Sequence, residues 1–277
     1  MRMLALPRFF VMYDWIYDRF GSIGLLTATL SFGFCFYFVF VRLSYSYYFI
    51  QNRNRYVPDY QENPEELRDA KLWSARNIIG NTLFVFPIQL LIVFGYSKLY
   101  YGLGEHGWVY LIASTVGAIL FAETSIYWLH RALHVRPLYG WLHAVHHRFR
   151  EPTSWVSYAF NPLDSFIQSL PYHVYIFLIP TNAWIYMSLW IFSSFWTLTI
   201  HDRVRWTPDF LGSIVNHTGC HTAHHWFHRH NYGNYFTFWD RICGTYFDPD
   251  RLPHKFFAVK SGATRRDSAE RQQPAQL

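Results

Sequence analysis

The sequence predicts an all-α integral membrane protein, a polytopic helical bundle of four or five apolar helices that carries a histidine-rich helical cap on one side. Two observations predict this fold class. Charged residues are nearly absent from five long stretches of the 277-residue chain, and 14 of its 15 histidines lie outside those stretches. The mean hydropathy of −0.01 hides this segregation, because it averages apolar and polar segments.

The composition excludes several other classes of protein. A hydrophobic fraction of 51% excludes an intrinsically disordered chain. Three cysteines, Cys35, Cys220 and Cys243, are too few and too dispersed for a disulfide-stabilised scaffold. The net charge of +6 occurs without a nucleic-acid-binding motif, so no nucleic-acid partner is expected.

The five apolar stretches are the predicted helices. They are Ile23–Val41, Ile78–Tyr96, Trp108–Leu129, Phe166–Pro180 and Trp184–Ile200. Together they contain one residue, Glu123, of the 24 basic and 18 acidic residues in the chain. The first three approach or exceed the ~20 residues that cross a bilayer. The last two are shorter and predict a helical hairpin that either crosses fully or returns to its starting side. Charge-free runs of this length disfavour the alternative, five buried helices of a soluble enzyme.

The remaining segments are polar or mixed. Residues 1–22 predict an amphipathic, aromatic lead-in, because Pro7 and Arg8 interrupt the apolar run that a signal peptide needs. Residues 54–76 are interpreted as a polar connector, and residues 260–277 as a flexible polar tail.

The basic residues predict how the helices are oriented. If all five stretches cross, segments 42–77, 130–165 and 201–277 lie on one side and hold 20 of the 24 Lys and Arg residues. Cytoplasmic loops carry such an excess. The same side holds most of the histidines, so the histidine-rich cap is expected to be cytoplasmic.

Eight of these histidines form three clusters with helical spacing. They are His130 and His134, then His143, His146 and His147, then His221, His224 and His225. Residues four apart lie on one side of a helix, so each cluster is expected to aim its imidazoles at one locus.

Clustered neutral imidazoles are typical ligands of iron, zinc and copper. Eight nitrogens suffice for two metal ions with about four each, whereas one structural zinc needs only four. His201, at the end of the last apolar stretch, is a candidate ninth ligand. The cap is therefore expected to hold a di-metal site.

Four further residues are candidates to support the metal ligands. Glu123 lies seven residues before His130, where its carboxylate could accept the second N–H of a ligand imidazole. His173 is an ionisable residue inside an apolar stretch, which marks it as a functional candidate. Asp202 and Asp240 are weaker candidates of the same kind.

The histidine clusters resemble those of the fatty acid hydroxylase and sterol desaturase superfamily of membrane di-iron oxygenases. They read HRALH at 130–134, HAVHH at 143–147 and HTAHH at 221–225, and a Trp-Asp pair at 239–240 fits the same pattern. The strings QSLPYH at 168–173 and NYGNYFT at 231–237 look more like the sterol C-5 desaturase branch. The resemblance extends over about residues 123–248.

The resemblance implies an oxidoreductase that introduces a C5–C6 double bond into a Δ7-sterol taken from the bilayer. It implies two iron ions, with zinc as an alternative in recombinant material, and O₂ as oxidant. Electrons would come from NAD(P)H through a carrier such as cytochrome b5 or a ferredoxin with its reductase. It further implies one integral-membrane domain over 1–277 with a catalytic core at about 108–250. This domain would reside in the endoplasmic reticulum of a eukaryote or the inner membrane of a bacterium.

Two alternatives stay open at this point. A lipid hydroxylase of the same superfamily would act on fatty acyl, sphingoid or C-4 methyl sterol substrates. A metal transporter is a remote alternative, because transport needs ligands near the bilayer midplane rather than at one face.

Overall fold

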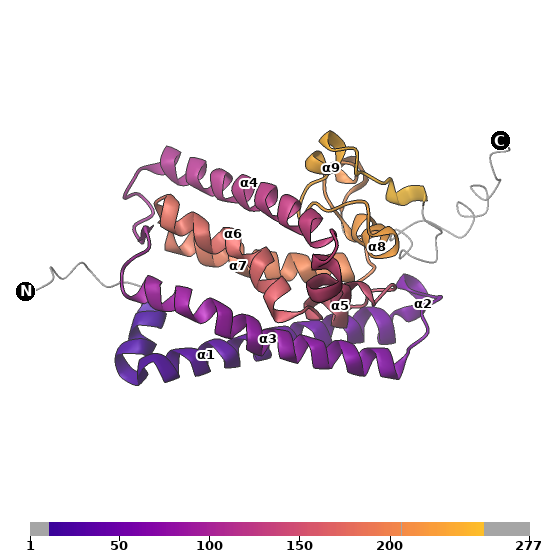
Figure 1. Ribbon diagram of the computed structural model, residues 1–277, viewed down its shortest axis with the longest axis horizontal. Coiled ribbons are helices and arrows are strands. Elements are labelled where there is room, and N and C mark those ends of the chain that lie inside the picture. Colours follow the sequence, from indigo (N-terminus) through magenta and orange to yellow (C-terminus); the bar gives the residue numbers. More distant parts are fainter. Residues whose placement is uncertain (1–10, 206, 252–277) are drawn as a thin grey trace, which may run out of the picture.

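The computed structural model describes residues 11–205 and 207–251, and within them the chain is mostly helical (Figure 1). The predicted tail at 260–277 lies outside the described residues. Five long helices form a bundle, and the short helices that carry six of the eight clustered histidines gather at one end of it (Figure 1).

The first layer of the bundle is formed by α1 (Val11–Tyr45) and α3 (Pro64–Val93), which pack side by side (Figure 1). A kink at Gly21, where φ is 64°, separates the first turns of α1 from its apolar part. The predicted lead-in is therefore helical from Val11. A π-helical turn, Ser46–Gln51, and the short helix α2 (Arg53–Tyr56) connect the two long helices.

The helix α3 corrects the prediction of a polar connector over 54–76. It begins at Pro64, more than three turns before the apolar stretch. The Asn63 side chain caps it by accepting hydrogen bonds from the N–H groups of Glu65 and Glu66. Proline at the first helical position and acidic residues in the first turn favour a helix start at this point. Polarity alone does not prevent a helix from extending out of an apolar segment.

The second layer is formed by α4 (Trp108–Leu133), α6 (Pro162–Leu178) and α7 (Ala183–His201). Helix α6 contacts both α3 and α4, so it joins the two layers. A side chain on Gly80 of α3 would collide with Pro162, and the absence of one lets α6 approach closely. The predicted hairpin is thus formed by α6 and α7.

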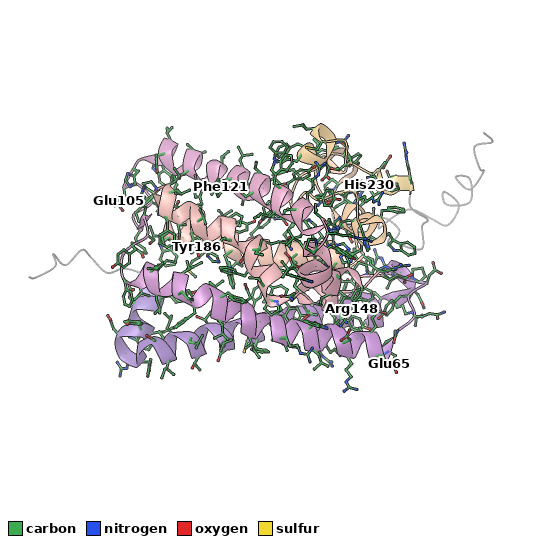
Figure 2. All side chains as sticks on the ribbon, in the orientation of Figure 1. Glu65, Glu105, Phe121, Arg148, Tyr186 and His230 are labelled. Carbon is green, nitrogen blue, oxygen red and sulfur yellow. The ribbon has the colours of Figure 1, made fainter. Side chains whose placement is uncertain are left out.

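The two ends of the bundle differ. At one end the strands β1 (Leu99–Tyr100) and β2 (Thr181–Asn182) pair in parallel and tie two helix connections together. Figure 2 places Glu105 at this end and His230 and Arg148 at the other. At that other end lie a π-helical turn (Tyr139–His143), α5 (Ala144–His147), α8 (Thr218–Phe227) and α9 (Phe238–Ile242). Short 3₁₀ turns at Ser154–Tyr158, Asp209–Leu211 and Pro249–Arg251 complete it.

Four helical segments are long and apolar enough to span a membrane. They are Tyr13–Gln51, Pro64–Val93, Trp108–Leu133 and Ala183–His201. On α4 the exposed residues Val109, Ile112, Val116 and Leu120 recur every three or four positions. This spacing places them on one face, which suits contact with lipid. The chain is an integral membrane protein, as predicted, and the shorter α6 is the fifth apolar helix.

Candidate metal centre

Helix ends position the predicted ligands. His130 lies in the last turn of α4, His134 follows that helix as its C-cap, and His201 is the final residue of α7. The second cluster occupies the π-helical turn and α5, and the third occupies α8. The apolar helices therefore bring imidazoles from sequence positions 130 to 225 to one end of the bundle.

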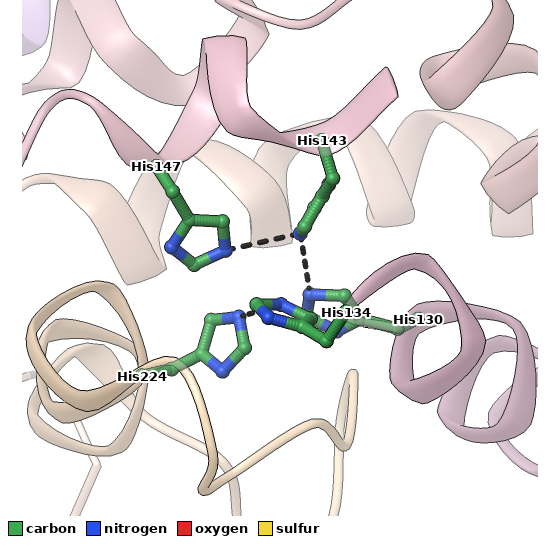
Figure 3. A group of neighbouring side chains, drawn as sticks. All are labelled: His130, His134, His143, His147 and His224. Carbon is green, nitrogen blue, oxygen red and sulfur yellow. Dashed lines mark hydrogen bonds between the residues drawn. The ribbon is translucent and has the colours of Figure 1, made fainter. Parts of the chain in front are cut away.

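The structure brings all nine predicted ligands together in two groups. The five-histidine group consists of His130, His134, His143, His147 and His224 (Figure 3). The four-histidine group consists of His146, His201, His221 and His225. Within each group the ligand atoms lie within 4.8 Å of one another, and among these nine side chains only His134 is more than slightly exposed.

The expectation that each cluster serves a single locus holds for His130 and His134 and is wrong for the second and third clusters. His143 and His147 belong to the five-histidine group, whereas His146 belongs to the four-histidine group. The third cluster divides in the same way, because His224 separates from its neighbours. Residues four apart share a helix face, but adjacent residues point about 100° apart. Each short helix therefore contributes to both groups and fixes the spacing between them.

The Nε2 atoms converge inside each group. The Nε2 of His143 lies 3.0 Å from those of both His130 and His147. In the other group the Nε2 of His221 lies 2.9 Å from that of His201 and 3.1 Å from that of His225. Two nitrogens bound at about 2.1 Å to one metal ion, and roughly at right angles, are separated by about 3 Å. The spacing of the imidazoles therefore fits metal coordination.

The hydrogen bonds on the far side of the rings strengthen this assignment. The Nδ1 of His130 donates to the carbonyl of Tyr232 at 3.0 Å, and the Nδ1 of His143 donates to Asp164 at 2.7 Å. Both acceptors lack a hydrogen, so in the neutral rings the protons lie on Nδ1 and both Nε2 atoms carry lone pairs. Two lone pairs 3.0 Å apart repel each other. A cation between them turns the repulsion into ligation.

Burial favours the neutral, ligating form of the histidines outside the membrane-spanning helices. Loss of hydration lowers the pKa of His146, His147, His221, His224 and His225 well below the usual value of 6.5, and neighbouring imidazoles lower it further. The pKa of His134 is lowered by the same two causes. Metal ions bind the neutral imidazole, so these environments suit metal binding at neutral pH.

Asp164 is the carboxylate that orients a ligand, and it was not among the predicted supporting residues. It is fully buried in the first turn of α6, and it also accepts a hydrogen bond from Gln168. An acidic residue just before an apolar stretch is a sequence signal that could have identified it. Its partner, 21 positions away, could not be read from the sequence.

Glu123 does not orient an imidazole as expected. Its buried carboxylate accepts hydrogen bonds from the N–H groups of Asn234, Tyr235 and Phe236. Both ring nitrogens of His130 have other partners. Glu123 therefore anchors the loop that follows α8 to the middle of α4.

The other three predicted supporting residues have different environments. Asp240 accepts hydrogen bonds from the N–H groups of Tyr232 and Gly233, and it thereby holds the carbonyl that His130 contacts. Asp202 accepts a hydrogen bond from the N–H of Val204 in the turn after α7. His173 pairs with the Tyr186 hydroxyl at 2.7 Å and joins neither histidine group.

The fatty acid hydroxylase family model matches residues 115–245. Mouse lathosterol oxidase is 41% identical over 181 residues, which cover 63% of this chain and 60% of that protein. Rat lathosterol oxidase is 35% identical over 219 residues, 76% of this chain and 72% of its own length.

A fungal relative extends the similarity further along the chain. The Delta(7)-sterol 5(6)-desaturase of Schizosaccharomyces pombe is 36% identical over 236 residues, which cover 85% of this chain and 70% of that protein. No solved structure matches the chain. The matched region of the family model contains all nine histidines of the two groups.

Proposed function

This chain belongs to the fatty acid hydroxylase family, and we propose that it is a sterol desaturase that introduces the C5–C6 double bond into a Δ7-sterol. The observation that carries the proposal is the pair of buried histidine groups, which offers ligands for two metal ions. The names of the similar proteins, lathosterol oxidase and Delta(7)-sterol 5(6)-desaturase, supply the substrate class.

We assign two iron ions to the two groups, one to each. When iron is bound, the centre supplies the activation of O₂ that removal of hydrogen from unactivated carbons requires. Overall, two hydrogens leave adjacent carbons of the sterol, and O₂ is reduced to two waters with two electrons and two protons from outside the chain. Side chains alone provide no oxidant of this strength.

The protein's own residues orient the ligands and exclude water. Asp164 and the backbone carbonyls of Tyr232 and His230 fix the rings of His143, His130 and His224. On the other group, the Phe160 ring stacks on His146 with ring centroids 3.8 Å apart. This apolar contact shields the second ion position from water, as oxidation of an apolar substrate requires.

The electron supply and the orientation in the membrane belong to the same proposal. We propose that a carrier of the cytochrome b5 or ferredoxin type delivers electrons to the histidine-rich end. This end is assigned to the cytoplasmic side, of the endoplasmic reticulum or of a bacterial inner membrane, because it adjoins the segments that hold most Lys and Arg residues. We also propose a single domain over 1–277 with its catalytic core at about 108–250, since the nine histidines and the loop that Glu123 anchors fall within that core.

A sterol-feeding experiment tests the activity. The full chain is expressed in a host that lacks its own sterol C5-desaturase, a Δ7-sterol is supplied, and lipids are profiled. We expect a Δ5,7-sterol, recognised by its conjugated-diene absorbance, and none from a His146→Ala variant that still inserts into the membrane. A hydroxylated fatty acyl, sphingoid or C-4 methyl sterol product in place of the diene would instead assign the hydroxylase alternative.

A further inference from the structure

A polar cavity lies between the two layers of the bundle, beside the metal centre. Its volume is about 160 Å³, and it is lined by residues of α3, α4, α6 and α7, by the 3₁₀ turn Ser154–Tyr158, and by Phe160 and Asn234. Ten of its fifteen lining residues are Asn, Gln, Ser or Thr, in a region where the surrounding helices are apolar. Polar groups at membrane depth indicate a functional site.

Two amide side chains in this lining have oxygens without a partner. Asn77 and Asn81 lie four residues apart on α3, so they share one face of that helix. The amide oxygen of each is buried and has no hydrogen-bond partner in the described part of the chain. Asn77 itself is 2% exposed and donates through Nδ2 to the carbonyl of Tyr158. Burial of an acceptor without a donor is costly, so both oxygens suit a ligand that carries a donor.

The neighbouring hydroxyls already make hydrogen bonds. The hydroxyls of Ser157, Ser169, Ser194 and Thr197 each donate to a carbonyl three or four residues earlier in their own segment. Asn77 and Asn81 differ from them because, within the described part of the chain, their buried side-chain oxygens make no hydrogen bond.

Single residues connect the cavity to both histidine groups. Phe160 lines the cavity and stacks on His146 of the four-histidine group. Gln168 lines it as well and donates to Asp164, whose other oxygen accepts from His143 of the five-histidine group. The wall of the cavity is therefore one residue, Phe160, from the four-histidine group and two residues, Gln168 and Asp164, from the five-histidine group.

We propose that this cavity binds the hydroxyl end of the sterol, with the 3-hydroxyl group donating its one hydrogen to the amide oxygen of Asn77 or to that of Asn81. The inference rests on the proposed desaturase function. In a 3-hydroxysterol the hydroxyl-bearing carbon and C5 belong to the same ring. A site that recognises the hydroxyl must therefore adjoin the oxidising centre, as this cavity does.

The size of the cavity is consistent with partial enclosure of the substrate. Pockets that bury a whole drug-sized ligand measure roughly 300–1,000 Å³. A cavity of about 160 Å³ encloses the polar end of a sterol, and the remaining rings and the side chain extend toward the lipid between the helices. The two asparagines thus determine which end of the sterol enters first.

The test compares binding of a Δ7-sterol and its 3-O-methyl ether, which lacks the donor. Binding is measured with radiolabelled ligands on the purified full chain in lipid nanodiscs. We expect the wild-type chain to bind the free hydroxyl form about tenfold more tightly. Asn77→Leu and Asn81→Leu should each reduce this preference, and the double variant should abolish it. The control Gln89→Leu, on α3 but outside the cavity lining, should retain it.

The outcomes separate this inference from the proposed function. Equal binding of the two ligands by the wild-type chain would overturn the inference without any variant, so variants that fail to fold do not decide the matter. An unchanged preference in the folded double variant would also overturn it. Diene formation by the wild-type chain reports on the desaturase function alone. A hydroxyl preference that depends on both asparagines, without diene formation, would support the binding site and contradict the reaction.

Discussion

The two histidine groups differ in how firmly their rings are held. In the five-histidine group, the Nδ1 atoms of His130, His143 and His224 all donate to fixed acceptors. In the four-histidine group, His201 donates to the carbonyl of Thr197, whereas the Nδ1 atoms of His146 and His225 have no hydrogen-bond partner within the described residues. In the five-histidine group the same is true of one ring, that of His147. Outer hydrogen bonds fix the tautomer and raise the basicity of a ligand.

The groups also differ in their surroundings. The carboxylate of Asp164 contacts His143 of the five-histidine group. The aromatic ring of Phe160 covers His146 of the four-histidine group on the side of the polar cavity. The two ion positions are therefore not equivalent. One is anchored by charge and backbone, and the other is the one in direct ring contact with the wall of the proposed substrate cavity.

Removal of one ligand from either group tests whether both ions are needed, and we expect the largest effect here. His224→Ala in the five-histidine group and His146→Ala in the four-histidine group should each abolish turnover, because an ion position loses a ligand. Metal analysis of the purified protein should fall from about two ions per chain toward one in each variant.

A matched control for these variants is His106→Ala, since His106 lies in the connection at the opposite end of the bundle. It should retain both ions and full diene formation. Full activity in the wild-type chain with one ion or fewer would contradict the assignment of two positions.

A change at Asp164 tests the difference between the groups directly. Asp164→Asn removes the charge that orients His143, and we expect a loss of about 10–100-fold in metal affinity or activity. The loss should fall on the five-histidine ion, while the other ion is retained. Metal content against free-metal concentration measures this effect.

The exposed residue Asp250 offers the matched control, since Asp250→Asn makes the same chemical change at a carboxylate that pairs with Arg205 rather than with an imidazole. Equal metal affinity in Asp164→Asn and Asp250→Asn would show that the carboxylate does not distinguish the groups.

The pH dependence of the stability of the metal-free protein tests a property that both groups share, the lowered pKa values of their histidines. The expected effect is smaller than those above. The histidines with lowered pKa values occur in both groups. Below about pH 6.5 the unfolded chain binds protons that the folded chain excludes, so stability falls as the pH falls. Each such histidine contributes a slope of at most about 1.4 kcal/mol per pH unit.

Thermal unfolding in detergent between pH 7.5 and 5.5 measures this slope. The melting temperature of the metal-free chain should decline over that range, and added metal should raise it at pH 7.5. A metal-free chain whose melting temperature stays constant would show that the histidines are hydrated rather than buried.

The division of the chain into membrane helices and a histidine-rich end was predictable because it depends on local composition. A run such as residues 108–129 has one ionisable group in 22 residues, and no tertiary contact is needed to place it in an apolar environment. The ligand types followed in the same way, since imidazole is a ligand wherever it is clustered and neutral. The early start of α3 was missed because hydropathy does not register a polar helix, although the Asn63 cap is a local signal that the sequence carries.

Only the tertiary structure decided which histidines lie at the same ion position. Spacing along the chain indicates which histidines share a helix face. That His146 and His147 join different groups depends on how the short helices meet at the end of the bundle. The partners of His143 and Glu123 were likewise out of reach, because one contact spans 21 residues and the other about 110.

The sequence by itself determined that this protein is a membrane helix bundle with enough imidazoles for two metal ions. Hydropathy and ligand chemistry are properties of the residues, and they persist in any fold the chain adopts. Only the tertiary structure decided which imidazoles meet, which carboxylate supports them, and that two residues lining the cavity beside them, Asn77 and Asn81, have buried oxygens without partners among the described residues. These are distances between segments remote in sequence, and packing alone sets them.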